Sequence, residues 1–340
     1  MKVIPVADAV GMVLCHDMSG ITPDVDMEHT FCRGHVVTEK DVPILLRTGA
    51  EHLFVLDMPP GHIHRDKAAM RIAKAAAGPG LTLAALSEGR VNMRADPGLL
   101  AINVEALYEI NSIEGIALAT MHDGMPIAAP RGVAGTCIAP LIVDEAKVEQ
   151  AEAICEAYSP IIQIRPLQPR SVAIITSDND LFHAQSREQS GPALSRKIEI
   201  LGSRTVGQAA VSSDAAATRD AILKFVVEGA DMVMIADGMF DDPGAPAIAG
   251  IRATGAEVIS YGSPIFPGAM FLLAYLGDIP ILGLPDNALI PRTSVFDLLV
   301  PRLLAGERIT RPNIISMGHG GFCAECDTCR YPLCSFGKHD

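Results

Sequence analysis

Four of the eight cysteines of this chain lie within twelve residues, at Cys323, Cys326, Cys329 and Cys334. In a reducing compartment, clustered cysteines are more typical of metal sites than of disulfides. Their spacing, C-x2-C-x2-C-x4-C with Pro332 shortly before the last cysteine, is close to that of bacterial ferredoxins. It predicts a [4Fe-4S] cluster. Zn2+ remains the alternative, because four thiolates can also adopt tetrahedral geometry.

The remaining cysteines and the histidines carry weaker signals. His62 and His64, in "GHIHRD", could bind a metal, but solvent-exposed or helix-capping histidines are commoner. We expect the scattered cysteines to be free, buried thiols: Cys15, Cys32, Cys137 and Cys155. The chain has no P-loop, no G-x-G-x-x-G and no G-x-S-x-G motif. This argues against ordinary nucleotide hydrolysis, Rossmann dehydrogenase chemistry and the α/β-hydrolase mechanism.

Length and charge narrow the class of protein. A chain of 340 residues is long enough for two domains with substantial cores. Its formal net charge of -13 disfavours nucleic acid as a partner, because nonspecific affinity for nucleic acid comes from clustered Lys and Arg. The sequence shows no apolar run of the roughly 20 residues that span a bilayer, and its N-terminus lacks a signal peptide. We therefore predict a cytoplasmic protein that does not bind membranes.

The elements expected from residue 170 onward alternate in type. The continuous apolar runs "SVAIIT", "ADMVMIAD" and "IPILGLP" are typical of strands buried on both faces, and amphipathic segments lie between them, the first over about 187–201. This alternation predicts a three-layer α/β domain with a mostly parallel sheet. The preceding residues mix short strands with helices, including one expected to be capped by Asp66 and one by Asp144. We predict an α+β domain over 1–165, the α/β domain over 166–310 and a metal-binding tail over 311–340.

Ligands of such sheets bind beyond the carboxyl ends of the strands. Those ends read "TSDND", "ADGMFDDPG", "YGSPIFPG" and "GLPDN", so glycine, proline and acidic residues should meet at one edge. In this order the four segments resemble the ligand-binding loops of molybdopterin-binding domains. Further segments, among them "VADAVGMVLCHDM", "AGTCIAPLIVDE" and "GHGGFCAECDTCRYPLCSFGK", resemble a branch of the molybdotransferase (MoeA-like) family that ends in a cysteine cluster. The resemblance covers nearly the whole chain.

The resemblance implies a MogA/MoeA-like fold, a homodimer, and a role in molybdenum cofactor biosynthesis with a molybdoenzyme as partner. It implies that molybdopterin, or a related small anionic ligand, binds at the strand ends, since glycine turns let backbone N-H groups approach phosphate and acids can hold Mg2+. Asp242 would help to hold Mg2+ in catalysis, together with Asp178 or Asp241. The implied ligand contacts are Thr176, Ser177, Asp178, Asp237, Gly238, Asp241, Pro267, Gly268, Gly283, Pro285 and Asp286.

Several of these positions depart from the family pattern. Ser177, Asp237 and Asp286 stand where the family has glycine, and Asn179 stands where it has glutamate. A carboxylate that faces a phosphate at about 4 Å costs a few kcal/mol at an intermediate dielectric unless a cation lies between them. The sequence leaves two functions open. One is a transferase that ligates molybdate; the other is a noncatalytic carrier or maturation factor, which these departures favour.

Overall fold

The structure is a computed structural model that describes residues 2–15, 17–18, 31–56, 58–85, 88–177, 184–212, 214–236, 245–285 and 293–338. The chain forms two compact units. The first unit consists of Met1–Asp96, Ile102–Met121 and Pro130–Gln163. The second unit consists of Pro97–Ala101, His122–Ala129 and Ile164–Asp340. Each unit is described by itself.

The N-terminal part of the first unit is a small antiparallel sheet with the strand order β1-β3-β2. Its elements are β1 (Lys2–Pro5), the 3-10 helix η1 (Val6–Asp8), β2 (Val13–Leu14), α1 (Val42–Arg47) and β3 (His52–Leu56). Leu14, Leu45 and Leu53 are fully buried and form its core. Helix α1 is short: its last residue is Arg47, Thr48 is its C-cap, and Gly49 follows with a positive φ.

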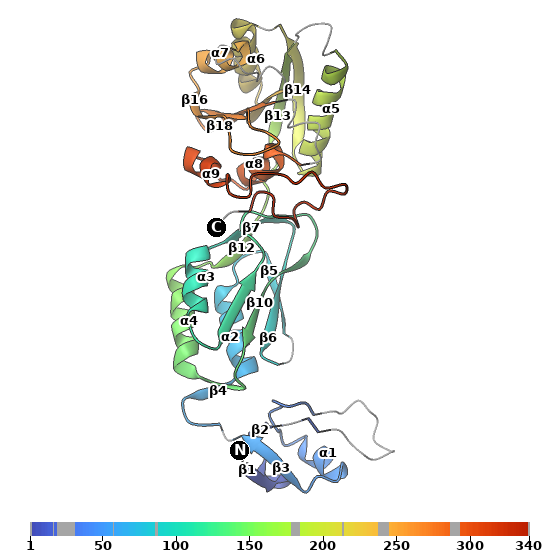
Figure 1. Cartoon of the computed structure of the whole chain (residues 1–340), viewed down its shortest axis with the longest axis vertical. Coiled ribbons are helices and arrows are strands. Elements are labelled where there is room, and N and C mark those ends of the chain that lie inside the picture. Colours follow the sequence, from blue (N-terminus) through green and yellow to red (C-terminus); the bar gives the residue numbers. More distant parts are fainter. Residues whose placement is uncertain are drawn as a thin grey trace. The chain divides into compact units, whose positions relative to one another are not determined.

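A four-stranded antiparallel sheet with the order β5-β6-β10-β8 forms the rest of the first unit, and α2 packs against β6 and β10 (Figure 1). The bounds are β4 (His62–His64), α2 (Arg65–Ala76), β5 (Leu81–Ala85), β6 (Arg90–Ala95), α3 (Val104–Asn111), β8 (Ile116–Thr120), β10 (Arg131–Ile138), β11 (Ile142–Asp144) and α4 (Glu145–Ala157). A separate sheet, most of whose residues belong to the second unit, has the order β12-β7-β9, from β7 (Gly98–Ile102), β9 (Pro126–Ile127) and β12 (Ile162–Arg165).

The two predicted helix caps differ in outcome. Asp144 caps α4 as expected, because its Oδ1 accepts from the backbone N-H of Ala146 at 3.0 Å. The prediction that Asp66 caps α2 was wrong. The cap is His64, whose Nδ1 accepts from the backbone N-H of Asp66 at 3.3 Å. The Asp66 carboxylate instead accepts from the backbone N-H of Gly89, which ties the start of the helix to the turn before β6.

The second unit contains a six-stranded mixed sheet with the order β14-β13-β15-β18-β17-β16. Its strands are β13 (Ser171–Ser177), β14 (Arg204–Val211), β15 (Met232–Ala236), β16 (Glu257–Tyr261), β17 (Leu272–Leu276) and β18 (Ile279–Leu284). The first four strands in this order are parallel. Strand β17, which the sequence analysis did not predict, is antiparallel to both of its neighbours. It follows that β16 runs in the same direction as β18.

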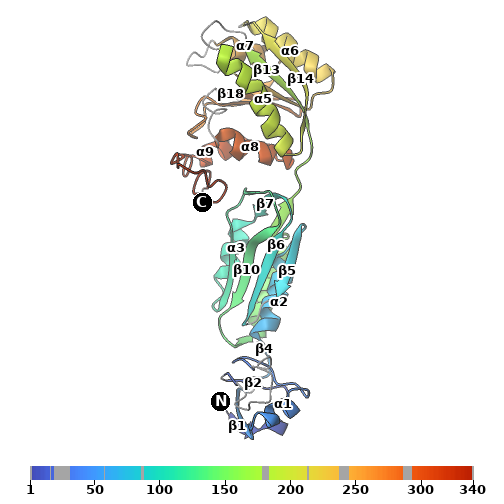
Figure 2. The same ribbon diagram turned by 90° about the vertical axis from the view of Figure 1, so that its right-hand side faces the viewer.

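Helices cover both faces of this sheet, as predicted (Figure 1, Figure 2). They are α5 (Ala184–Ile200), α6 (Ala215–Val227), α7 (Pro246–Ala253), α8 (Val295–Leu304) and α9 (Arg311–Ser316). Ile174 of β13 packs in one core cluster with residues of α5, α8 and α9. Its neighbour Ile175 packs in the other cluster, with residues of α6 and α7. Consecutive residues of β13 are therefore both buried, and this explains its continuous apolar sequence.

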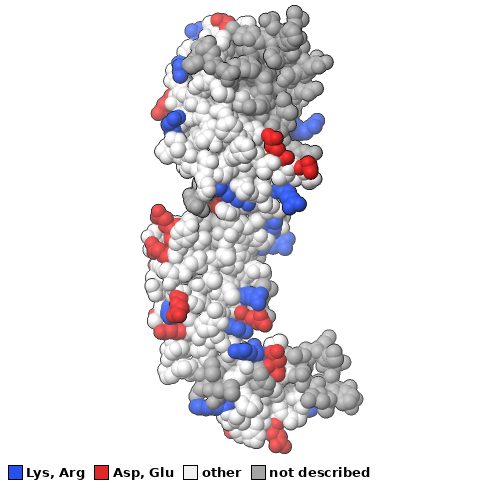
Figure 3. Space-filling model, viewed as in Figure 1, with Lys and Arg blue, Asp and Glu red and all other residues white. Residues whose placement is uncertain are grey.

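Two surface observations bear on the predicted partners. In the part of the chain that is described, no helix is both long and apolar enough to span a bilayer. On the face that Figure 3 shows, Lys and Arg side chains are interspersed with Asp and Glu, and the described residues form no broad basic patch there.

Candidate functional site

The tail that follows α9 is anchored on the core of the second unit. Phe336 is only 3% exposed and belongs to the core cluster that includes α8. The hydroxyl of Tyr331 donates to the backbone carbonyl of Asp297 at 2.9 Å, and Gly337 lies so close to Leu298 that a Cβ at this position would collide with it. The tail is therefore held in place by packing against the core, whereas the sequence analysis predicted only a bound metal in this segment.

The glycines of "GHGG" also serve this packing. The N-H of Phe266 donates to the carbonyl of Gly321 at 2.7 Å, and the N-H of Cys323 donates to the carbonyl of Phe266 at 2.9 Å. These bonds pair the tail with the loop after β16. A Cβ at Gly320 would meet the carbonyl of Lys338, so a side chain there would prevent the tail from closing on itself. The glycine run is explained by backbone packing.

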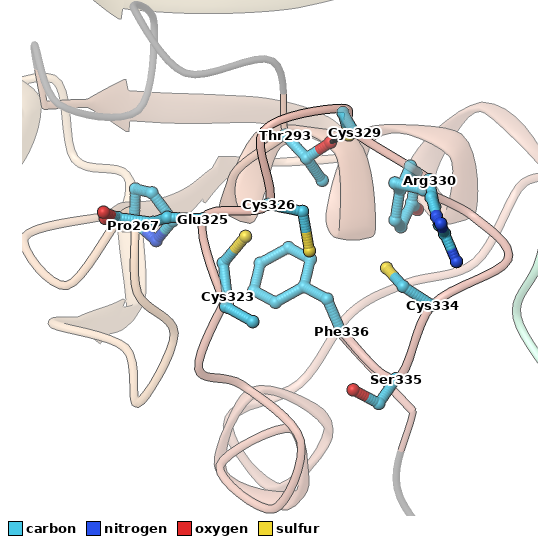
Figure 4. A pocket seen from close by; sticks show the side chains of 12 residues that line it. Pro267, Thr293, Cys323, Glu325, Cys326, Cys329, Arg330, Cys334, Ser335 and Phe336 are labelled. Atoms are coloured by element: carbon cyan, nitrogen blue, oxygen red, sulfur yellow. Dashed lines mark hydrogen bonds between the residues drawn. The ribbon is translucent and has the colours of Figure 1, made fainter.

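All four tail cysteines line a single cavity of about 290 Å³. Figure 4 shows the sulfurs of Cys323, Cys326 and Cys334 directed toward the space around the ring of Phe336, with Cys329 beside Thr293. The remaining lining residues are Pro267, Thr293, Ala324, Glu325, Arg330, Tyr331, Ser335 and Phe336. Four soft thiol donors on one cavity are the donor set that iron-sulfur clusters and zinc prefer.

The cavity is larger than one ion requires. A water molecule takes up about 30 Å³ of liquid, so the cavity has room for a group of several atoms. No three His, Cys, Asp or Glu residues in the described ranges lie close enough together to hold a single metal ion. The four thiols and the volume of the cavity would suit a polynuclear cluster better than a single ion.

Two of the three hydroxyl groups that line this cavity, those of Thr293 and Tyr331, have different hydrogen-bond partners. Thr293 is 4% exposed, and its Oγ1 lies 3.1 Å from the Sγ of Cys329. Burial raises the pKa of Tyr331 well above its usual range, and the negative charge of Asp297 acts in the same direction. Tyr331 therefore stays protonated and keeps its bond to the Asp297 carbonyl. Sequence reasoning missed both residues: Tyr331 lies between Cys329 and Cys334 but is not a metal ligand, and nothing in the local sequence of Thr293 links it to the cysteines.

The carboxyl ends of the parallel strands meet at one edge of the sheet. Thr176 of β13 lies beside Ala236 of β15, and Ala236 lies beside Leu284 of β18. Three of the segments that resemble molybdopterin-binding loops begin at this edge, at Thr176, Ala236 and Gly283. Ser177 is the last residue of β13 and pairs with Val211. Six predicted site residues lie outside the described residues: Asp178, Asp237, Gly238, Asp241, Asp242 and Asp286.

The other predicted contacts are engaged by the protein itself. Gly283 lies inside β18, between Ile235 and Leu272, and is followed by the buried pair Leu284 and Pro285. The carbonyl of Pro267 accepts from the N-H of Val295 at 3.1 Å. Gly268 has a φ of +123°, and a Cβ there would collide with Val295. Pro267 and Gly268 thus hold the start of α8 against the loop that follows β16.

The two helices α7 and α8 differ in how many backbone N-H groups of their first turn are already hydrogen-bonded. In α8 the capping box uses the N-H groups of Ser294, which donates to Asp297 Oδ2 at 2.9 Å, and of Phe296, which donates to Ser294 Oγ at 3.3 Å. The N-H of Val295 bonds Pro267, so the first turn of α8 has no donor left for an anion. Helix α7 begins after Ala245 without a side-chain cap. Of these two starts, α7 suits a phosphate better.

The cysteines outside the tail and His64, all among the described residues, show no sign of a metal site or a reactive thiol. All four scattered cysteines are free thiols, but only Cys155 is buried; Cys32 is exposed and the other two are partly buried, so the expectation of burial was wrong for three of them. Burial raises the pKa of Cys155 to about 11, which makes it unreactive. His64 Nδ1 accepts the helix cap bond, and the ring is buried, so His64 serves α2 and is not an exposed metal ligand.

Comparisons with known proteins give distant similarities. One family profile, described as "Domain of unknown function (DUF8806)", matches residues 3–57. No curated protein matches. Similar solved structures include the molybdopterin biosynthesis MoeA protein of Pyrococcus horikosii, at 14% identity over 90% of this chain and 74% of that chain, with a TM-score of 0.31.

Two further structures match a smaller part of the chain. The MoaB enzyme of Thermus thermophilus is 13% identical over 41% of this chain and 98% of its own, with a TM-score of 0.29. The protein CinA of Thermoplasma acidophilum, of unknown function, is 11% identical over 40% of this chain and 95% of its own, with a TM-score of 0.31. Similarity at this distance assigns no activity to the chain.

Proposed function

We propose that this chain binds molybdopterin, or a related small anionic ligand, and acts in the assembly, insertion or delivery of the molybdenum cofactor. The observation that carries the proposal is the register of Thr176, Ala236 and Leu284, after which the three motif-bearing segments leave one edge of the sheet. The resemblance of these segments to molybdopterin-binding loops supports the ligand. Asp178, Asp241 and Asp242 would supply carboxylates for Mg2+.

Calorimetry tests this proposal. Titration with molybdopterin in the presence of Mg2+ should give saturable binding, and a pterin without the phosphate should bind more weakly. The Asp242→Asn variant should lose the effect of Mg2+, whereas Asp278→Asn, which changes an exposed aspartate of the same unit, should bind like the unchanged protein. Absence of binding with and without Mg2+ would instead favour an interaction factor with a degenerate pterin site.

The tail is the second part of the proposal. Cys323, Cys326, Cys329 and Cys334 would hold a [4Fe-4S] cluster, with Zn2+ as the alternative, in the cavity that they line. The volume of that cavity favours the cluster. Anaerobic purification, metal analysis and an absorption spectrum decide: about four iron atoms per chain and a brown colour support the cluster. A colourless protein with one zinc selects the alternative, and a metal-free protein overturns both.

We place the chain among noncatalytic carriers or maturation factors. Asn179 replaces the family's glutamate, and the start of α8 is closed by its own capping box. An assay of molybdate ligation should therefore show no turnover, and turnover would select the transferase. Restoring glycine by Ser177→Gly, Asp237→Gly and Asp286→Gly should raise affinity for the pterin if the site has decayed; unchanged affinity indicates a repurposed site. A homodimer and a molybdoenzyme partner remain predictions of the resemblance.

A further inference from the structure

We infer that Thr293 is a positioning residue for the tail cluster: its hydroxyl donates a hydrogen bond to the Cys329 thiolate and raises the reduction potential of the cluster. The inference rests on the proposed iron-sulfur centre and adds to it a residue from outside the cysteine segment. The two atoms, Thr293 Oγ1 and Cys329 Sγ, lie 3.1 Å apart although 36 positions separate the residues in the chain.

The position of Thr293 is fixed from several sides. It directly precedes Ser294, the N-cap of α8, and the next residue, Val295, is bonded to the carbonyl of Pro267. Thr293 is 4% exposed, so its hydroxyl has little access to bulk water. Pro267 and Thr293 both line the cysteine cavity. The hydroxyl is therefore held at the sulfur by the same contacts that begin the helix.

The state of the sulfur decides which group donates. In the free thiol either atom could be the donor. A cysteine that is bound to a cluster carries no proton, so its sulfur only accepts and Thr293 must donate. In reduction, one electron enters the cluster, no thiolate leaves and no proton is needed. Part of the added negative charge falls on the Cys329 sulfur, so the hydrogen bond stabilises the reduced state more than the oxidised one.

The other hydroxyl with an assigned partner in the cavity does not compete for this role. Tyr331 donates to the backbone carbonyl of Asp297 at 2.9 Å and so is directed toward α8. Among the described residues that line the cavity, Thr293 is the one whose side chain is hydrogen-bonded to a cysteine sulfur. Its removal should therefore change one contact of the cluster and leave the others in place.

Three substitutions test the inference. Thr293→Val keeps the shape of the side chain and removes the hydroxyl, and Thr293→Ser keeps the hydroxyl. Thr218→Val is the matched control, because Thr218 is also buried (3% exposed) and donates to the carbonyl of Asp214, away from the cysteines. Iron content is measured first, and the cluster is then titrated anaerobically with dithionite, which supplies the electron, while its spectrum reports the midpoint potential.

We expect Thr293→Val to lower the ratio of reduced to oxidised cluster about tenfold at a fixed potential. For a one-electron couple this is a midpoint about 59 mV lower. Thr293→Ser and Thr218→Val should match the unchanged protein. A fully loaded Thr293→Val protein with an unchanged midpoint overturns the inference alone, whereas iron-free unchanged protein overturns the tail cluster itself. Loss of iron from Thr293→Val but not from Thr293→Ser supports the hydrogen bond, and loss from both overturns it.

Discussion

Gly268 illustrates how a residue that resembles a ligand contact can also be required by the fold. Its positive φ and the closeness of Val295 both exclude a side chain, independently of any pterin. Retention of glycine at such a position is therefore weak support for binding. Gly283 is likewise part of the fold, because it lies inside β18 between Ile235 and Leu272. Sequence analysis could identify these glycines but not assign their role, since the role depends on the start of α8.

The substitution Gly268→Ala should destabilise the second unit by about 2–4 kcal/mol, because it adds a collision with Val295 to the cost of a positive φ. Gly255→Ala is the control. Gly255 also has a positive φ, of +84°, but nothing lies within 4 Å of its added Cβ. It should lose only about 1–2 kcal/mol. Urea unfolding measures both, and equal losses would show that the contact with Val295 is harmless.

His64 should make the first unit sensitive to mild acid. Burial lowers the pKa of His64 below its ordinary value, and the opposing effect of Asp66 is smaller. The unfolded chain therefore takes up a proton more readily than the folded one, so the free energy of unfolding falls as pH drops through about 6.5. Above that pH both states are neutral at this ring and the contribution to stability is fully present.

The substitution His64→Asn tests this, since asparagine can still cap α2 but does not titrate. Between pH 7 and pH 5 its stability should fall less than that of the unchanged protein. His52→Asn, at an exposed position of β3, should leave the pH dependence as it was. Chemical unfolding across this pH range measures the difference, and parallel curves for the unchanged and His64→Asn proteins would contradict it.

Strands that are buried on both faces could be predicted from the sequence. Features that depend on contacts between residues far apart in the chain could not. The apolar runs of β13, β15 and β18 indicate buried strands because consecutive side chains face opposite cores. The run over β17 is also apolar, but periodicity alone does not distinguish a short buried strand from a buried helix. The spacing of the tail cysteines pointed to a metal site, whereas the contact of Thr293 with Cys329 depends on how α8 and the tail pack.

The tail as an element should depend on Phe336. Its ring is buried in the core cluster that also contains residues of α5, α8 and α9. Phe336→Ala should therefore lower the free energy of unfolding by about 3–5 kcal/mol and release the tail. Phe322 is the matched control in the same segment, because its ring is 77% exposed. Phe322→Ala should change stability by less than about 0.5 kcal/mol. Limited proteolysis should cut Phe336→Ala within the tail and spare the control; equal resistance of the two variants would disprove the anchor.

At the scale of the whole molecule, the division into two units predicts two separate unfolding transitions. The core cluster of Leu14, Leu45 and Leu53 lies entirely in the first unit, and both faces of the large sheet are packed within the second. Each unit should therefore unfold in its own transition in calorimetry.

The net charge of the chain leads to a separate prediction. With a formal net charge of -13, the chain should not be retained on a polyanionic resin at physiological salt.

Removal of the tail metal tests this division and the proposed centre together. Binding of a metal to the folded state alone stabilises that state, so loss of the metal should lower the melting temperature of the second unit and leave the first transition unchanged. Mild acid should lower the melting temperature of the first unit, through His64, and leave that of the second unit unchanged. Scans of loaded and chelated protein at pH 7 and pH 5.5 give the four combinations. If chelation and acid shift both transitions together, the units are coupled. If chelation shifts neither, the four cysteines contribute no metal-linked stability and the tail is held by Phe336 and Tyr331 alone.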